Sequence, residues 1–349
     1  MPPLEYIVAG IIVVAMVVYL VTGGADFGGG IWHLLATGER KKEQRHAVSH
    51  AIAPIWEANH VWLIVAIVLL FVCFPRAFAT MMTALHIPLT AMLIGIVLRG
   101  SAFAFQSYSA GATTLQNRSE RVFAAASTAT PFLLGVSAGA VATGQIRLRD
   151  DGTVATDFVS EWFAAFPFAI GAFTVTLCAL LAAVYMAVEV DDEALAEDFR
   201  IRGLVAAIAA GLCAAVSIAL AANEAPIIWR GLVESSWAIP FQALTAIAAT
   251  TAIVALWRRR YRIARIAAAT QVGLIVTGWA LAQFPYLVYP DLTIESAAAE
   301  AAILRPVLIA LAAGSLLLAP SFWYLYRVFK GEKDDHPEAA GFSPAESTD

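Results

Sequence analysis

The 349-residue chain is poor in charge: charged residues make up 14% of it, whereas a soluble globular chain averages about 25%. Hydrophobic residues reach 60% and the mean hydropathy is +0.74. This composition excludes a disordered chain and an ordinary soluble enzyme, and it favours a polytopic membrane protein. The net charge of −5 gives no indication of nucleic-acid binding.

Cysteine and cofactor motifs are also scarce. Cys73, Cys178 and Cys213 all lie in apolar runs without a CxxC pair, which excludes a disulfide scaffold and favours small buried residues. There is no Walker A motif, no CxxCH haem attachment and no convincing pair of deep histidines for a bis-imidazole haem. We therefore expect this chain to bind no metal and no cofactor. The start MPPLEYIVAG has no basic n-region, so we expect a retained first helix and no cleaved signal.

Long apolar runs dominate what is present, and each is bounded by charges, prolines or glycines. Since lipid cannot satisfy an open backbone, they predict an all-α integral membrane protein with about nine transmembrane helices. A weak division into two four-helix bundles plus one peripheral helix fits this number. The predicted spans are 6–34, 52–74, 79–98, 122–144, 162–187, 203–222, 238–257, 263–287 and 301–327.

The basic residues are distributed unevenly along these spans. With the N-terminus outside, 17 Lys and Arg fall on the inside and 5 on the outside. This split follows the positive-inside rule and predicts an external N-terminus and a cytoplasmic C-terminus. The polar residues 330–349 predict a disordered cytoplasmic tail after a transmembrane domain of residues 1–329. The acidic segment 189–200 is interpreted as a solvated connection.

Ionisable residues inside the spans are the candidate functional residues, because each is costly in hydrocarbon. Asp26 lies in a stretch with five glycines in the eight positions 23–30, which would let another helix approach closely. We interpret Asp26 as a buried, paired acid; the alternative is a small-residue packing face with a snorkelling Asp.

Glu57 and His60 are three residues apart and share one helix face. A carboxylate beside an imidazole can relay protons, although each could instead be a satisfied structural residue. Helix rise places Asp26 about 12 Å and Glu57 about 9 Å from the cytoplasmic ends of their antiparallel spans. Both acids, with His33 nearer the cytoplasm, therefore outline a proton entry route.

The other candidates are weaker. Arg99 ends its span on the cytoplasmic side, either as an interface anchor or as an ion-pair partner for Asp26 or Glu57. His86, beside Pro88, is interpreted as a hydrogen-bonded core residue. His46 and His50 are four residues apart in a basic loop, but no third ligand accompanies them.

Several long motifs make the sequence resemble subunit II of the cytochrome bd ubiquinol oxidases, especially the cyanide-insensitive branch. The resemblance covers nearly the whole chain. The motifs are GADFGGG at 24–30, PIWEANHVWLI at 54–64, HIPLT at 86–90, IVLRGS at 96–101, TPFLLG at 130–135, AAVYMAVE at 182–189 and RRYRIAR at 259–265.

The resemblance implies a subunit of a quinol:oxygen oxidoreductase in the bacterial inner membrane. The partner, subunit I, would carry the haems (b and d-type, or b only) and the ubiquinol site, while this chain would bind no haem and act as a scaffold. The acid at Glu57 would deliver protons from the cytoplasm. The family motif after the arginine usually continues with an acid and a second arginine, but Ala104 and Gln106 are uncharged here, so that pair has no counterpart.

Two other functions stay open from the sequence. A proton-coupled secondary transporter also uses broken glycine-rich helices and membrane carboxylates. Two observations disfavour a transporter: the acids lie away from the midplane of the membrane, and the sequence has no second glycine-rich span that would pair with the first. The other function that stays open is that of a purely structural membrane subunit. The resemblance leaves open the quinone type, a bound quinone or lipid, and a small single-helix subunit.

Overall fold

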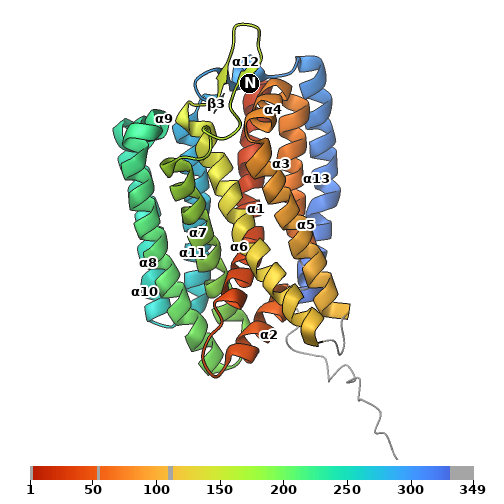
Figure 1. Ribbon diagram of the computed structural model, residues 1–349, viewed down its shortest axis with the longest axis vertical. Helices are drawn as coiled ribbons and strands as arrows, with labels where there is room; N and C mark the ends of the chain where they lie inside the picture. Colours follow the sequence, from red (N-terminus) through yellow and green to blue (C-terminus); the bar gives the residue numbers. More distant parts are fainter. Residues whose placement is uncertain (1–2, 53–55, 109–112, 331–349) are drawn as a thin grey trace, which may run out of the picture. The chain divides into compact units, whose positions relative to one another are not determined.

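The structure is a computed structural model that describes residues 3–52, 56–108 and 113–330 (Figure 1). Nearly all of these residues are helical, as the apolar runs predict. The elements in chain order are α1 (Leu4–Leu34), α2 (Lys41–Ile52), α3 (Trp56–Cys73), α4 (Pro75–Ala84), α5 (His86–Tyr108), α6 (Thr113–Thr143), β1 (Arg147–Leu148), β2 (Val154–Ala155), α7 (Ala165–Glu189), α8 (Glu193–Glu224), α9 (Pro226–Trp229), the π-helix η1 (Arg230–Glu234), α10 (Ala238–Trp257), α11 (Tyr261–Gln283), β3 (Tyr286–Val288), β4 (Leu292–Thr293), α12 (Ile294–Ala297) and α13 (Ala301–Lys330).

The chain divides into two compact units, residues 1–300 and 301–349. The described part of the second unit is one helix, α13, which contains Pro306 and Pro320. It corresponds to the predicted ninth span. The predicted tail at 331–349 lies outside the described residues, so the boundary at 329 stays a prediction.

Eight of the described helices are long and apolar enough to cross a membrane, and a ninth span results if the bent pair α3–α4 is counted as one. This confirms the all-α membrane fold. The predicted span 79–98 differs in detail: α4 forms a separate short helix, bent by 114° from α3, and the span itself begins at His86. Pro75 causes the break, because a proline is tolerated in the first turn of a helix and disrupts its interior.

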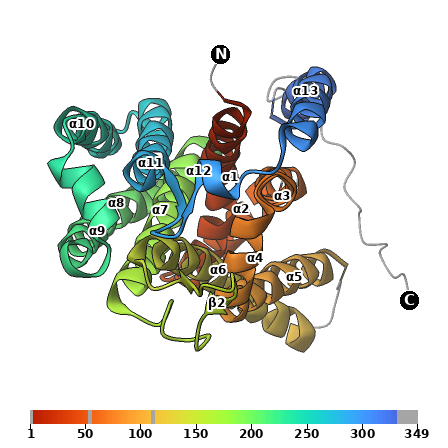
Figure 2. The same ribbon diagram turned by 90° about the horizontal axis from the view of Figure 1, so that it is seen from above.

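Two helices hold the first unit together. α1 packs against α3, α6, α7 and α11, and α7 also packs against α6, α8 and α11 (Figure 2). The pairs α5–α6 and α10–α11 complete the groups on either side of them. The core at their junction contains small residues of α7 and large ones of α1 and α6, including Ala182, Ala183, Tyr19, Trp32 and Phe123.

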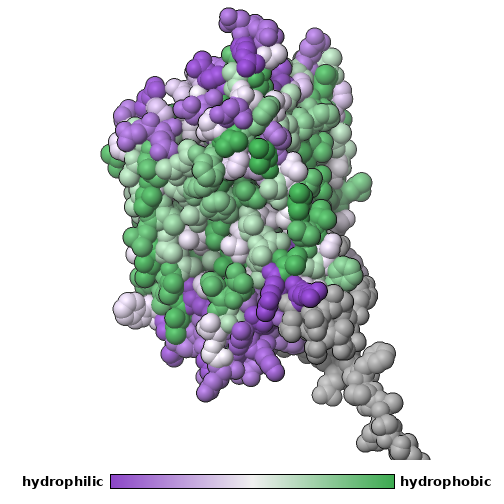
Figure 3. All heavy atoms as spheres, in the orientation of Figure 1, coloured by the Kyte–Doolittle hydropathy of each residue, from purple (hydrophilic) through white to green (hydrophobic). Residues whose placement is uncertain are grey.

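The ends of the helices carry the polar residues, and apolar residues cover the middle (Figure 3). At one end, Arg40 forms a bidentate ion pair with Asp198, at 2.6 and 2.9 Å, and Arg45 pairs with Glu120 at 2.9 Å. At the other end, Arg147 pairs with Asp291 at 3.1 Å.

Arg259 also pairs with Glu197 at 3.4 Å, so the segments 40–45, 118–121, 197–202 and 258–260 lie together at one end, and the predicted topology places the basic residues of all four on the inside. The basic segment after α1, predicted as a loop, instead forms the helix α2. The opposite end carries two short antiparallel hairpins, β1–β2 and β3–β4, which the hydropathy pattern did not predict.

Candidate functional site

The glycine stretch of α1 is a contact surface for two other helices. A Cβ added at Gly28 would lie 1.9 Å from the carbonyl oxygen of Cys178 on α7, and one at Gly30 would lie 2.2 Å from Ser127 on α6. The indole of Trp32 also donates a 2.7 Å hydrogen bond to the carbonyl of Ala179. The close approach predicted from these glycines is thus present.

Asp26 lies within this contact region and is 6% exposed. The amide nitrogen of Asn59, on α3, donates a 2.6 Å hydrogen bond to Asp26 Oδ2. Asn59 itself is 2% exposed. The structure therefore agrees with a buried, partnered acid at this position rather than with a carboxylate that snorkels to the surface.

Arg99 of α5 is 2% exposed, so it is a buried cation and not an interface anchor. Its Nε donates a 3.2 Å hydrogen bond to Ser127 Oγ, and its guanidinium lies 4.9 Å from the ring centre of Phe27 and 5.4 Å from that of Phe123. Its charge also interacts with that of Asp26. These aromatic, polar and charged partners offset part of the several kcal/mol that burying a cation costs.

His60 is half-buried and faces α1. Its Nδ1 lies 3.5 Å from the hydroxyl of Tyr19, and its ring centre lies 5.8 Å from those of Tyr19 and Phe27. An imidazole and a phenol at this separation can exchange a proton after a small approach, because each can donate or accept.

Glu57 is placed only in part. It lies in the first turn of α3, two residues before Asn59. The Asn59–Asp26 hydrogen bond places Asn59 beside Asp26 along the helix axes. The backbone of Glu57, two residues before Asn59, therefore lies near the depth of Asp26, as the helix rise predicts. The side chain of Glu57 is outside the described residues, as are Pro54 and the side chain of Gln106. Ala104 is exposed on α5.

His33 lies on α1 between Asp26 and the end of the helices that carries α2. It is 2% exposed, its ring lies 5.9 Å from that of Phe123, and Arg45 donates to its carbonyl oxygen at 3.2 Å. In the part of the chain that the structure describes, its Nδ1 has no hydrogen-bond partner. His33 is thus a buried imidazole between Asp26 and the polar end of the helices.

The remaining histidines do not assemble into a site. His46 and His50 stack on α2, with ring centres 6.3 Å apart, and His86 Nδ1 lies 3.1 Å from the carbonyl oxygen of Thr83. Among the described residues, no three His, Cys, Asp or Glu side chains are grouped so that they could hold a metal ion.

Sequence reasoning identified Asp26, His60 and Arg99 but missed the partners that join them. Tyr19, Asn59 and Ser127 are uncharged, so a search for charged groups and histidines in the spans passes over them. Spacing could have found Tyr19: it lies seven residues before Asp26, on about the same face of α1.

A family model and one relative match nearly the whole chain, and a second relative matches part of it. The family model described as "Cytochrome bd terminal oxidase subunit II" matches residues 4–329. A Bacillus subtilis (strain 168) protein named "Putative cytochrome bd menaquinol oxidase subunit II" is 23% identical over 328 residues, which are 90% of this chain and 92% of that protein. The "Cytochrome bd ubiquinol oxidase subunit 2" of the same organism is 34% identical over 99 residues, 28% of each chain.

A solved structure, that of the bd oxidase from Geobacillus thermodenitrificans, has the same fold. It matches with a TM-score of 0.79 at 22% sequence identity, over 95% of this chain and 99% of the other.

Proposed function

The chain belongs to the cytochrome bd terminal oxidase subunit II family, and from this premise we propose that it supplies a proton path from the cytoplasm to the oxygen-reducing centre of a bd-type quinol oxidase. It is a subunit of such an oxidase, and its place in the complex implies subunit I as its partner. The family assignment favours this function over the proton-coupled transporter.

The observation that carries the proposal is the buried acid at the junction of α1 and α3. Asp26 is hydrogen-bonded by Asn59 and interacts with the buried Arg99. A purely structural helix contact in lipid needs none of these groups, since small apolar residues pack closely without a desolvation cost. Ionisable residues at membrane depth are typical of ion and proton pathways.

The groups also follow one another along α1 and α3, which run in opposite directions (Figure 1). His33 and Glu57 lie toward the end with α2, Asp26 and Asn59 come next, and His60 and Tyr19 follow. In this proposal, Glu57 takes up the proton, Asp26 holds it, and His60 with Tyr19 passes it on. Arg99 positions Asp26 through its charge.

Oxygen reduction and quinol oxidation are assigned in this proposal to haems b and d-type, or b only, and to a quinol site, all on subunit I. The quinol is proposed as ubiquinol from the resemblance, while the two B. subtilis relatives bear the names of a menaquinol and a ubiquinol oxidase. The second role of this chain is to support subunit I. The basic end with α2 is proposed as cytoplasmic.

The test is turnover and proton uptake of the complex that contains Glu57→Gln. This variant keeps the shape and hydrogen bonding of Glu57 but removes its titratable group. Oxygen consumption per haem should fall by about tenfold or more, since general acid–base groups contribute on that scale, and Glu57→Asp should retain part of it. Glu39→Gln, at an exposed position before α2, is the matched control and should have no effect.

Proton uptake is recorded in oriented vesicles from the same preparations. If Glu57→Gln consumes oxygen and takes up protons at the wild-type rate with normal haem content, the path does not run through Glu57. The chain would then be a structural subunit.

A further inference from the structure

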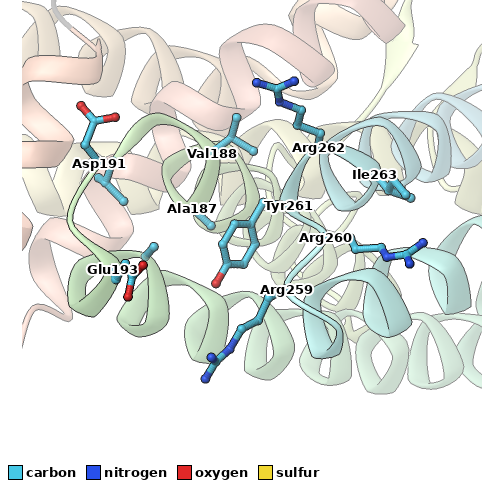
Figure 4. Close-up of a pocket in the computed structure, with 11 residues that line it drawn as sticks. Ala187, Val188, Asp191, Glu193, Arg259, Arg260, Tyr261, Arg262 and Ile263 are labelled. Carbon is cyan, nitrogen blue, oxygen red and sulfur yellow. The ribbon is translucent and has the colours of Figure 1, made fainter.

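A second polar feature lies away from the buried acids. A cavity of about 450 Å³ is formed where α7 ends, α8 begins and the turn between α10 and α11 crosses (Figure 4). It is lined by Ala187, Val188, Val190, Asp191, Glu193, Ala196, Arg259, Arg260, Tyr261, Arg262 and Ile263.

The ends of four candidate spans surround this cavity, so it lies at the boundary between membrane and water. α7 ends at Glu189, α8 begins at Glu193, α10 ends at Trp257 and α11 begins at Tyr261. Phospholipid headgroups occupy this level of a bilayer, so a headgroup can reach this cavity. The location holds whichever side of the membrane this end faces.

The charges of the lining are separated by sign. Arg260 comes from the α10–α11 turn and Arg262 from the first turn of α11, while Asp191 comes from the α7–α8 connection and Glu193 begins α8 (Figure 4). A headgroup that carries only a negative charge would meet two carboxylates as well as the arginines. A headgroup with a phosphate at one end and an ammonium at the other matches both sides.

We propose that this cavity binds the headgroup of an amine-bearing phospholipid, of the phosphatidylethanolamine class. Arg262 binds the phosphodiester, and Asp191 and Glu193 accept hydrogen bonds from the ammonium group, while the side chain of Arg260 extends away from these acids (Figure 4). Ile263, which is exposed, provides an apolar edge next to the glycerol and the first acyl carbons. Arg259 is held by Glu197 at 3.4 Å and closes the site beside α8.

The test uses the purified oxidase complex, which is delipidated and reconstituted into nanodiscs that contain a photoactivatable phosphatidylethanolamine, phosphatidylglycerol or phosphatidylcholine. Mass spectrometry then counts cross-links to residues 187–196 and 258–263. The wild-type complex should be labelled most strongly by phosphatidylethanolamine. Arg262→Gln should lower this labelling about fivefold, equivalent to the ~1 kcal/mol that one arginine contributes near a membrane surface.

The matched control is Arg258→Gln, which removes the same charge four residues earlier, in the α10–α11 turn, at a residue that does not line the cavity. It should leave the labelling unchanged. The double variant Asp191→Asn/Glu193→Gln should abolish the preference for phosphatidylethanolamine over phosphatidylglycerol while retaining phosphate-dependent labelling.

Three outcomes would overturn the proposal. Equal losses in Arg262→Gln and Arg258→Gln would show a general surface attraction. A preference for phosphatidylglycerol that survives the acidic double variant would show that the ammonium group is not recognised. Displacement of the lipid by millimolar inorganic phosphate would show a site for free phosphate.

Discussion

Asn59 donates its hydrogen bond to Asp26 across the interface of α3 and α1, at 2.6 Å, between two side chains that are almost completely buried. The two residues are 33 positions apart in the sequence. This bond links helix α3, which carries Glu57, to helix α1, which carries the glycine stretch. A substitution at either residue should therefore affect both helix packing and proton transfer.

Asn59→Ala should destabilise the complex by about 1–3 kcal/mol, because a buried carboxylate oxygen loses its donor. Thermal unfolding of the purified complex measures the effect. Thr22→Ala is the control: Thr22 donates only to the carbonyl of Val18 in its own helix, at 2.8 Å, so its replacement should change stability little. Equal midpoints for Asn59→Ala and wild type would contradict the role given to this bond.

Asp26→Asn should lower both stability and turnover, unlike Glu57→Gln, which should lower turnover alone. The amide cannot interact with the charge of Arg99 as the carboxylate does, and a buried arginine without its anionic partner is costly. Haem content, unfolding midpoint and oxygen consumption per haem distinguish the two variants. If the Asp26→Asn complex is fully stable and has normal turnover, Asp26 is needed neither for the stability of the complex nor for proton transfer.

Gly28→Ala should prevent normal packing of α1 on α7, because the new Cβ would lie 1.9 Å from the backbone oxygen of Cys178. Overpacking of this kind costs about 1–3 kcal/mol or more. Gly10→Ala in the same helix is the matched control, since nothing lies within 4 Å of its Cβ position. The amount of assembled complex per membrane and its unfolding midpoint should fall only for Gly28→Ala.

The charge count predicts which end of the helices faces the cytoplasm. A cysteine at position 296, in α12, should react with an impermeant maleimide added outside intact cells, and one at position 260 should react only after the cells are opened. The cysteine background is suitable: Cys73 and Cys178 are fully buried. Cys213 is partly exposed, so its reaction is measured in the parent protein. The reverse pattern would invert the proposed topology.

The loop between β2 and α7 should open in acid. Asp157 accepts hydrogen bonds from the backbone N–H groups of Ser160 and Val159, at 2.8 and 2.9 Å, and these bonds hold its pKa below the usual 3.8. Because the folded pKa is lowered, this contribution is present above about pH 4 and is lost as the pH falls through the folded value. Pepsin cleavage within 157–163 should therefore increase between pH 4 and pH 2.

Asp157→Asn is the control for this pH effect. It keeps an acceptor oxygen but cannot titrate, so the pH dependence that remains reports other groups. If the wild-type loop and the variant show the same change in cleavage between pH 4 and pH 2, Asp157 does not control the opening.

Most of the fold could be predicted from the sequence because the lipid bilayer determines where apolar and charged residues can lie. Runs of about 20 apolar residues have few alternatives in a bilayer, and the basic residues sort to one end of them. The short elements were not predictable in this way. α4 depends on the break at Pro75, and the hairpins β1–β2 and β3–β4 are too short to give a period in hydropathy.

The candidate site was predictable where a residue is unusual in its surroundings. Asp26 and Arg99 stand out because charge is costly in hydrocarbon, and helix rise was enough to place Asp26 near the level of α3's first turns. Asn59 and Tyr19 were missed because their importance lies in which neighbour they reach across the helix interface. Such pairings depend on helix rotation, which the rise alone does not determine.

The packing of α1 on α7 also has a consequence for biosynthesis. Trp32 and its partner Ala179 are 147 residues apart, so at about 5–20 residues per second the ribosome needs roughly 7–30 seconds between making one and the other. During that interval the nascent first helix has no α7 against its glycines. Asn59 emerges much earlier, and an early α1–α3 hairpin would shield Asp26 from lipid while the remaining helices are inserted.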